Sequence, residues 1–356
     1  MLDLTHPLND GRTASSLLVR SLRGERTNPL PVWFMRQAGR SLPEYRKIRE
    51  GTTMLESCLN PDLVVEITLQ PVRRHKVDAA IFFSDIVIPL KLAGVEVEIE
   101  PGIGPVVANP VRSLEQLSRL SLIPSTALSP IVESVRRLTK ALGSTPLIGF
   151  GGAPFTLASY LIEGGPSRDL PHSRELMRTQ PEVWAEILNW CADVTAQFIR
   201  AQVEAGASAL QVFDSWAGKL SREEYLEFAK PHSERLFEQL ADLVDSRGQA
   251  VPRIHFGVGT GAILRDMFEC GATAMGVDAA TSLDEAAFAL PGVPLQGNVD
   301  STLLGDWQAL TKNLDEVLES GRLAPGHVVN LGHGVPKDTD PELLTKLVAR
   351  IHDLTK

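Results

Sequence analysis

Eight short apolar runs recur along this chain, and their recurrence limits the fold more than any other feature of the sequence. Most of the runs are separated by sequence with helical patterning, and most of them end in a polar or glycine cluster. A short apolar run bounded in this way is typical of a buried strand. The eight runs cover residues 31–35, 77–85, 146–152, 209–213, 253–256, 274–277, 294–298 and 328–331.

Strands that alternate with helices predict a parallel sheet with right-handed crossover connections. Eight of them favour a closed barrel over an open sheet, so we predict an α/β fold, a single-domain (β/α)8 TIM barrel over residues 1–356. Such barrels use from about 200 to more than 400 residues, which this length satisfies. Their active sites lie at the carboxyl ends of the strands, where the polar clusters of this chain fall.

The sequence between the strands predicts helices and one small insertion. The main helices are expected over residues 61–75, 114–120, 129–142 and 182–205. Asn60 is a suitable N-cap for the first of them, with Pro61 in its first turn. Residues 92–108 alternate apolar and acidic residues and turn at Pro101-Gly102, which predicts a solvent-facing β-hairpin inserted into the barrel.

The charge of the chain excludes some classes of partner. A net charge of -9 opposes non-specific binding to nucleic acid or to an anionic membrane. No run approaches the roughly 18 apolar residues of a membrane span, and residues 1–16 lack the layout of a signal peptide. We therefore expect a cytoplasmic protein. Cys58, Cys191 and Cys270 are widely scattered, which predicts neither a disulfide framework nor a CxxC metal site.

The stretch from residue 31 to residue 50 holds the densest group of candidate site residues. Its apolar start ends abruptly in the polar series Arg36-Gln37-Ala38-Gly39-Arg40. Two arginines four apart, beside a glycine that lets the backbone come close, can present two planar guanidinium groups to an anion. Alternatively, both arginines are surface residues that pair with Glu44 at helical spacing.

The whole stretch, PVWFMRQAGRSLPEYRKIRE, resembles the signature of the uroporphyrinogen decarboxylase family. Enzymes of this family convert the four acetate side chains of uroporphyrinogen III to methyl groups. The resemblance continues in family order through further motifs as far as Pro336. It implies a carboxy-lyase of porphyrin biosynthesis whose substrate contacts include Arg36, Gln37, Ala38, Gly39 and Arg40.

Asp85 closes the second apolar run, in the sequence Phe82-Phe83-Ser84-Asp85. An aspartate at a strand end commonly caps the next turn or pairs with an arginine. An ionised carboxylate, however, only accepts hydrogen bonds, and a macrocycle of four pyrroles offers four N–H donors. The family resemblance implies that Asp85 binds the substrate and stabilises positive charge on the ring being processed.

Two further motifs each contain one candidate. Tyr160 ends FGGAPFTLASY, which resembles the family pattern GFxGAPxTLxxY, although a lone tyrosine is usually a packing residue. The resemblance makes it a substrate contact. Ser215 lies in QVFDSWAG, close to the family form VQxFDSWAG. No GxSxG elbow surrounds it, so hydrogen bonding to a substrate carboxylate is a better role than nucleophilic attack.

His333 lies in NLGHGVP, which matches the family sequence NLGHG. A histidine between glycines is often merely exposed, but the glycines also allow a ligand to approach closely. It can bind a carboxylate as a cation or assist proton transfer. We predict a catalytic set of Asp85, Arg36, Tyr160 and His333, with Ser215 and residues 36–40 binding the substrate.

The resemblance implies no cofactor, because a protonated pyrrole can itself take up the electron pair left by departing CO2. It also implies a homodimer with facing active-site clefts.

Three alternative functions have less support in the sequence than this family resemblance. GVGTG at residues 257–261 lacks the Lys-Ser/Thr of a phosphate-binding loop, and it departs from commoner family sequences. A zinc-dependent methyltransferase would need a thiolate where Gly257 follows His255-Phe256. A non-catalytic tetrapyrrole carrier would keep the arginines without turnover.

Overall fold

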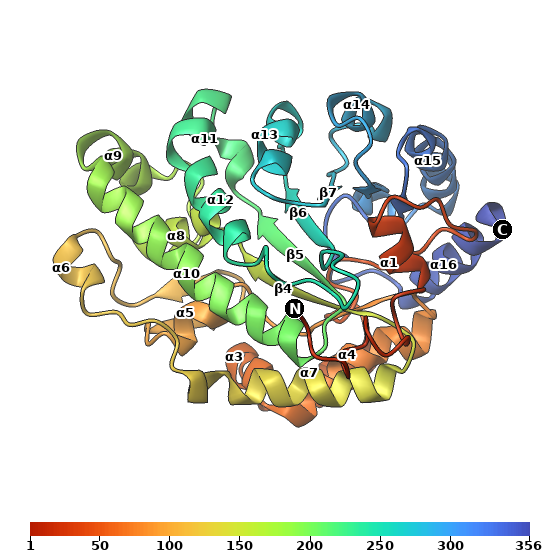
Figure 1. Cartoon of the computed structure of the whole chain (residues 1–356), viewed down its shortest axis with the longest axis horizontal. Helices are drawn as coiled ribbons and strands as arrows, with labels where there is room; N and C mark the ends of the chain where they lie inside the picture. The colour runs from red at the N-terminus through yellow and green to blue at the C-terminus, as the bar shows by residue number, and fades with distance from the viewer.

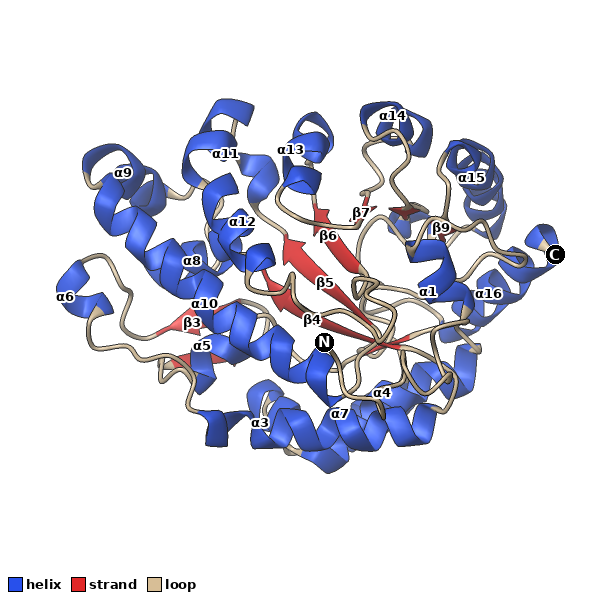
Figure 2. Ribbon diagram, viewed as in Figure 1, coloured by secondary structure: helices blue, strands red, loops and turns tan.

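A seven-stranded parallel sheet forms the centre of the protein in the computed structural model, which describes residues 1–356. The strands follow one another in chain order around the curled sheet, and the arrows of β4, β5 and β6 run side by side (Figure 2). The strands of this sheet are β1 (Ala80–Ile81), β4 (Leu147–Gly152), β5 (Ala209–Asp214), β6 (Arg253–Gly257), β7 (Ala274–Gly276), β8 (Leu295–Gln296) and β9 (His327–Val328).

Helices follow the strands and cover the outer side of the sheet (Figure 1). Two strands, β2 and β3, lie apart in a hairpin. The α-helices are α1 (Leu17–Leu22), α2 (Pro43–Ile48), α3 (Met54–Leu59), α4 (Pro61–His75), α5 (Ile88–Leu92), α6 (Leu114–Leu117), α7 (Ser129–Leu142), α8 (Pro154–Glu163), α9 (Pro171–Thr179), α10 (Pro181–Ala205), α11 (Arg222–Phe228), α12 (Lys230–Glu238), α13 (Leu264–Glu269), α14 (Leu283–Ala289), α15 (Trp307–Ser320) and α16 (Pro341–Thr355). The 3-10 helices are η1 (Ser125–Leu128), η2 (Ala217–Lys219), η3 (Gly261–Ile263), η4 (Ser301–Leu303) and η5 (Gly321–Leu323).

Most helices predicted from the sequence are confirmed. The expected helices at 61–75 and 129–142 are α4 and α7, and the one at 182–205 is α10. Asn60 caps α4 as expected, because its Oδ1 accepts hydrogen bonds from the backbone N–H groups of residues 62 and 63. The helix expected over 114–120 ends earlier, as α6.

The expected hairpin is also present, as β2 (Val97–Glu100) paired antiparallel with β3 (Gly104–Val107). The turn between the strands contains Gly102, whose φ of +82° favours a residue without a Cβ. The hairpin is joined to the end of α8, because Val107 N donates to Gly164 O at 2.9 Å.

The first expected strand, residues 31–35, is not a ladder strand. Val32 forms only an isolated parallel bridge with Val329. Pro31 has no N–H to donate, and the Val32 N–H goes to the Asp78 side chain, 2.8 Å from Oδ2. Backbone bonds remain on both sides: Asp78 N donates to Val32 O at 2.8 Å on one side, and on the other Val329 N donates to Pro31 O at 2.8 Å and Trp33 N donates to Val329 O at 3.3 Å.

Packing between the strands and α10 depends on glycine. Every residue of β4 is buried, because the helix layer covers one face of the strand and the interior of the curled sheet covers the other. A Cβ placed on Gly151 would lie 2.8 Å from Thr195 Cγ2 and 3.0 Å from Ile199 Cγ1. Because Gly151 has no Cβ, α10 can lie close against the strand.

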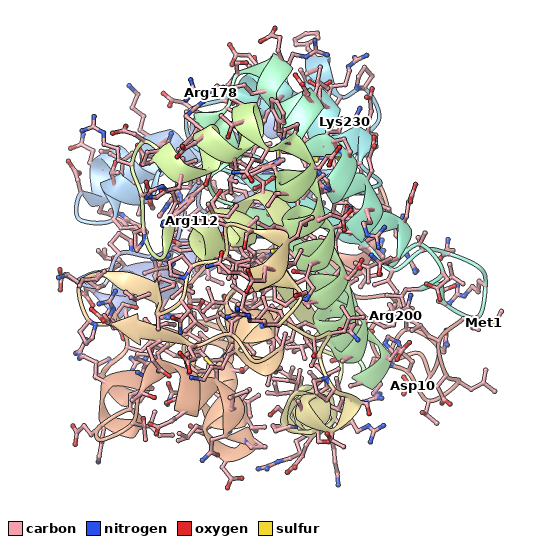
Figure 3. The ribbon with its side chains drawn as sticks, turned by 90° about the vertical axis from the view of Figure 1, so that its left-hand side faces the viewer. Met1, Asp10, Arg112, Arg178, Arg200 and Lys230 are labelled. Atoms are coloured by element: carbon pink, nitrogen blue, oxygen red, sulfur yellow. The ribbon has the colours of Figure 1, made fainter.

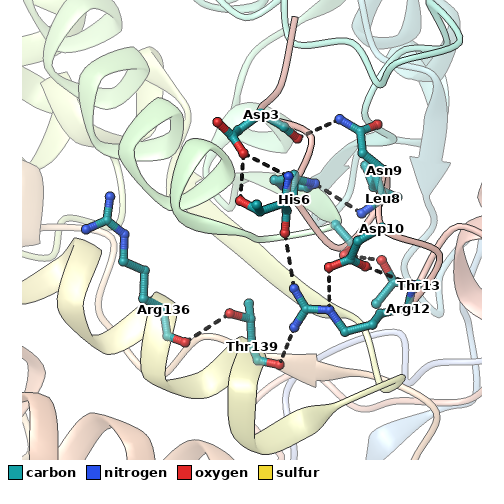
Figure 4. A network of polar contacts seen from close by, with 11 residues as sticks. Asp3, His6, Leu8, Asn9, Asp10, Arg12, Thr13, Arg136 and Thr139 are labelled. Carbon is teal, nitrogen blue, oxygen red and sulfur yellow. Dashed lines mark hydrogen bonds and ion pairs between the residues drawn. The ribbon is translucent and has the colours of Figure 1, made fainter.

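The segment before α1 is tied to two helices of the outer layer. Arg12 Nε donates to Asp10 Oδ2 at 2.7 Å, and Arg12 Nη1 donates to Thr139 O of α7 at 3.1 Å (Figure 4). The His6 ring bonds through Nε2 to Val203 O of α10 at 2.9 Å. These contacts hold the first residues against the ends of α7 and α10.

Charged side chains cover the outer face of the longest helix, α10. Arg200 lies toward its carboxyl end, and its Nη1 is 3.1 Å from Asp242 Oδ2 (Figure 3). The helix is amphipathic, with buried residues such as Trp184 and Ile199 facing the core. Neither α10 nor another helix is long and apolar enough to span a bilayer.

Substituting Gly151 tests how tightly α10 packs on β4. We expect Gly151→Ala to lower the free energy of unfolding by about 1–3 kcal/mol, because the added methyl group overpacks the contact. Urea denaturation measures this. Gly305→Ala is the control, since a Cβ there meets nothing within 4 Å; it should change the free energy by less than about 0.5 kcal/mol. Equal effects at the two positions would contradict the packing.

Candidate active site

The sequence-predicted site residues lie beyond the carboxyl ends of the strands. Asp85 follows β1, and Ser215 comes directly after the last residue of β5. Tyr160 is on α8, the helix after β4, and His333 is in the loop after β9. The strands of the sheet are parallel, so these ends share one edge.

Arg36 occupies a tight turn after the segment that contacts β9. Its φ is +61°, a left-handed conformation that is uncommon for a residue with a side chain. Two glycines make room for it. A Cβ on Gly39 would lie 2.9 Å from Arg36 O, and a Cβ on Gly334 would lie 2.5 Å from Arg36 Cδ. The Arg36 side chain therefore crosses the loop that carries His333.

Gln37 builds this turn and does not face the exposed site. Its side chain is fully buried. Oε1 accepts a hydrogen bond from Phe34 N at 3.0 Å, and Nε2 donates to Ala79 O at 3.1 Å. Both ends of the amide are thus used inside the protein, and the contact of Gln37 with substrate stays a prediction. Ala38 and Gly39, next in the turn, are half-buried.

The guanidinium groups of Arg36 and Arg40 are exposed and have no hydrogen-bond or ion-pair partner in the chain. Glu44 is not their partner. It forms a two-point contact with Arg74, at 2.8 Å to Nε and 2.9 Å to Nη2. The alternative in which Glu44 neutralises the two arginines is therefore wrong, and both positive charges are available to an anion.

One carboxylate oxygen of Asp85 is hydrogen bonded within the chain, and the other is not. Oδ1 accepts a hydrogen bond from Val87 N at 3.1 Å, and the other oxygen has no partner in the chain. Burial raises the pKa of Asp85 above its usual value, while the Val87 N–H and the Arg36 charge partly oppose that rise. The residue thus caps the next turn, as one reading of the sequence expected, and still offers an acceptor.

The Tyr160 hydroxyl makes no hydrogen bond within the chain. Burial, followed by the negative charge of Asp85, raises the pKa of Tyr160 to about 12, and the positive charge of Arg36 opposes this. The Tyr160 ring stacks on Trp216, with 4.2 Å between ring centroids. Tyr160, Asp85 and Arg36 are therefore close enough to influence one another electrostatically.

Ser215 is exposed in the turn after β5, and its hydroxyl has no partner in the chain. The next residue, Trp216, was not singled out from the sequence. It lies between the Tyr160 ring and the Lys219 ammonium, whose Nζ is 4.7 Å from the Trp216 ring centroid. The sequence feature that could have identified Trp216 is its position directly after the candidate site residue Ser215.

His333 is exposed next to the Arg36 side chain. Partial loss of water around the ring and the positive charge of Arg36 lower the pKa of His333 below its usual 6.5, and the charge of Asp278 partly offsets this. A lowered pKa makes the imidazole predominantly neutral at pH 7.

Asp278 also contacts the glycine loop at 257–261, because its Oδ2 accepts a hydrogen bond from Gly259 N at 2.6 Å. A carboxylate there opposes phosphate binding.

The residues of the zinc alternative have other partners. His255 Nδ1 is 3.0 Å from Met267 O, and its Nε2 faces Asp214. The Cys270 sulfur contacts Asp266 O at 3.3 Å, and burial raises the pKa of Cys270 to about 12. A zinc-binding cysteine must be ionised, which this burial disfavours.

Comparison with known proteins identifies the family. The family model described as "Uroporphyrinogen decarboxylase (URO-D)" matches residues 13–354. The chain belongs to the uroporphyrinogen decarboxylase family. The family predicted from the sequence motifs is therefore confirmed.

Relatives named uroporphyrinogen decarboxylase match the chain over almost its full length. The protein of Leifsonia xyli subsp. xyli is 56% identical, covering 99% of this chain and 98% of its own. The protein of Arthrobacter sp. (strain FB24) is 55% identical, covering 97% and 99%. Among solved structures, a methyltransferase from Methanosarcina mazei has a TM-score of 0.75 at 19% identity, covering 96% of this chain and 99% of that one. That likeness concerns the fold alone.

The influence of Arg36 on His333 can be measured by NMR titration at low ionic strength. The wild-type His333 ring should titrate with a midpoint below 6.5, the ordinary value. In Arg36→Gln the midpoint should rise, because a nearby positive charge no longer disfavours the imidazolium. A His333→Gln variant assigns the signal by its absence. An identical midpoint in wild type and Arg36→Gln would mean that the two side chains do not lie together.

Proposed function

We propose that this chain catalyses the stepwise decarboxylation of the four acetate side chains of uroporphyrinogen III, giving coproporphyrinogen III and CO2. The observation that carries the proposal is the unpaired oxygen of Asp85, beside the charge of Arg36 and the free hydroxyl of Tyr160. Four pyrrole N–H groups are donors without acceptors of their own, and a carboxylate is an acceptor without donors. The family of the chain agrees with this pairing.

The side-chain carboxylates of the substrate would be held by the groups around Asp85. Arg36 and Arg40 each offer a planar, unpaired guanidinium, which suits two-point binding of a carboxylate. The free Ser215 hydroxyl adds a neutral donor. Ala38, with only a methyl group, and Gly39, without a side chain, let the ring edge approach the backbone turn. This local positive charge attracts a polyanion despite the net charge of -9 on the chain.

The proposed reaction begins with protonation of a pyrrole ring carbon, which turns the ring into a cation. The ionised Asp85 carboxylate stabilises this cation. The bond between the acetate methylene and its carboxylate then breaks, CO2 leaves, and the electron pair forms an exocyclic double bond as the ring nitrogen recovers its lone pair. The methylene carbon takes a proton and the ring carbon loses one, so each cycle consumes one proton.

Proton transfer in this scheme falls to a group that exchanges its proton near neutral pH. The pKa of Tyr160, raised to about 12, keeps its hydroxyl protonated and suited to hydrogen bonding. The Arg36 guanidinium is assigned to orienting a carboxylate, because its planar donors suit two-point binding. His333, with a pKa below 6.5, is assigned to proton exchange with water at the site.

The pyrrole itself serves as the electron sink, so the proposed reaction needs no cofactor.

We also propose that residues 31–33, first in the chain, complete a (β/α)8 barrel as its remaining strand, since their backbone forms hydrogen bonds to the segments of β9 and β1 on either side. The barrel would be one domain with its cleft at the carboxyl ends of the strands. A homodimer and a cytoplasmic location, both implied by the family resemblance, stay predictions.

The reaction can be tested by anaerobic incubation of the metal-stripped protein with uroporphyrinogen III, followed by chromatography of the oxidised products. We expect seven-, six-, five- and four-carboxylate porphyrins to appear in turn. Asp85→Asn should lower kcat/KM by about 10²–10³-fold, the loss typical of removing one electrostatic stabiliser of a transition state. Asp315→Asn, which changes an exposed carboxylate on α15, is the control. Binding without turnover would favour a carrier, and activity that requires zinc and a methyl donor would favour a transferase.

The same variant tests the electrostatic strain at Asp85. Its pKa is raised in the folded state, so ionising it there costs more than in the unfolded chain, and the cost applies above the folded pKa. A neutral amide avoids this cost. Asp85→Asn should therefore unfold at a higher temperature than the wild type at pH 7, and the gap should close as the pH falls and Asp85 is protonated. A lower melting temperature at pH 7 would contradict the strain.

A further inference from the structure

A buried pair of titratable residues lies behind the turn that carries Ser215. Asp214 and His255 are both fully buried, and 3.8 Å separates Asp214 Oδ2 from His255 Nε2. Neither of these two atoms has a hydrogen-bond partner. Buried polar atoms without partners are costly and uncommon in folded proteins, so their mutual orientation calls for an explanation. The reaction scheme uses neither residue.

The His255 ring is oriented by its contact with α13. Met267 O, 3.0 Å from His255 Nδ1, can only accept a hydrogen bond, so Nδ1 is the donor. Nε2 is thereby turned toward Asp214 Oδ2, at a separation longer than a hydrogen bond. The buried ring therefore packs against the Oδ2 side of the Asp214 carboxylate and limits where that carboxylate can lie.

The other oxygen of Asp214 leads to the candidate site. Oδ1 accepts a hydrogen bond from the Thr156 hydroxyl at 2.8 Å. The oxygen of the same hydroxyl accepts from Trp216 N at 3.3 Å. Thr156 thus bridges the end of β5 to the backbone just beyond Ser215, and the turn between Asp214 and Trp216 is held at both ends.

The bridge reaches Tyr160 by two routes. Thr156 and Tyr160 are four residues apart on α8, so they lie on the same side of the helix. Trp216, whose backbone N–H the bridge holds, stacks on the Tyr160 ring. Displacing Thr156 or Asp214 would therefore move both Ser215 and Tyr160.

We propose that Asp214 and His255 are positioning residues that hold Thr156 and thereby set the places of Ser215 and Tyr160 for the substrate. They act through the Asp214–Thr156–Trp216 bridge and do not touch the substrate. The role in catalysis rests on the proposed function, whereas the bridge itself can be tested without turnover.

A fluorescence measurement tests the bridge directly. In a Trp307→Phe background, Trp216 is the one tryptophan that is not buried, so acrylamide quenching reports on it. We expect His255→Leu to raise the quenching constant, because the released turn exposes Trp216. His232→Leu is the matched control: it removes another buried imidazole, which bonds Asn189 at 2.9 Å on a different part of the helix layer. It should leave the quenching unchanged.

Kinetics with uroporphyrinogen III test the positioning role. His255→Leu should raise KM by about tenfold, because Ser215 and Tyr160 lose their fixed places for the substrate, and should change kcat less. His232→Leu should lower thermal stability and leave KM unchanged. If both variants lowered stability alike and neither changed quenching or KM, the pair would be only structural and the proposal would be overturned.

Thr156 gives a second test that leaves His255 intact, in case His255→Leu fails to fold. Thr156→Val should reproduce the rises in quenching and KM, and Thr156→Ser, which restores the hydroxyl, should reverse them. Unchanged quenching and KM in Thr156→Val would overturn the proposal. If the wild type showed no decarboxylation but Thr156→Val still raised the quenching constant, the proposed function would be refuted. The Asp214–Thr156–Trp216 bridge would still be supported.

Discussion

The docking of residues 31–37 between β9 and β1 is the contact on which the candidate site depends. It is made by buried polar side chains whose partners are specific, not by apolar contact alone. The bonds run from Trp33 Nε1 to Gln296 Oε1 at 3.0 Å, from Gln296 Nε2 to Gln211 Oε1 at 2.8 Å, and from Met35 N to Asn330 Oδ1 at 3.0 Å. Breaking one leaves a buried donor or acceptor unpaired, so the segment has one favourable position.

That single position brings unlike charges to one place. The buried amide of Gln37 fixes the turn in which Arg36 adopts its left-handed backbone, and Gly334 leaves room for the Arg36 stem. Arg36 then influences the pKa values of Asp85, Tyr160 and His333. A carboxylate whose pKa is raised by burial is unfavourable for stability when it is ionised. A substrate with four N–H donors would relieve this cost, and its carboxylates would pair with the Arg36 guanidinium.

Much of this organisation was readable from the sequence, and the failures have physical causes. Apolar runs that end in polar residues predicted β4, β5 and β6, and the capping pattern at Asn60 predicted α4. Residues 31–35 do not form the regular ladder strand expected, because the Asp78 side chain takes the Val32 N–H, which periodicity does not reveal. The burial of the Gln37 side chain could not be predicted from the sequence, because burial depends on the fold. The pairing of Asp214 with His255 joins two strands 41 positions apart, which one sequence does not show.

The most direct test of the central claim is a structure of the protein crystallised anaerobically with coproporphyrinogen III, the proposed product. The account predicts the macrocycle at the carboxyl ends of the strands, with pyrrole nitrogens within hydrogen-bond distance of Asp85 and propionate groups on Arg36 and Arg40. A macrocycle that binds at this edge with its nitrogens turned away from Asp85, or that binds on another surface, would contradict the account.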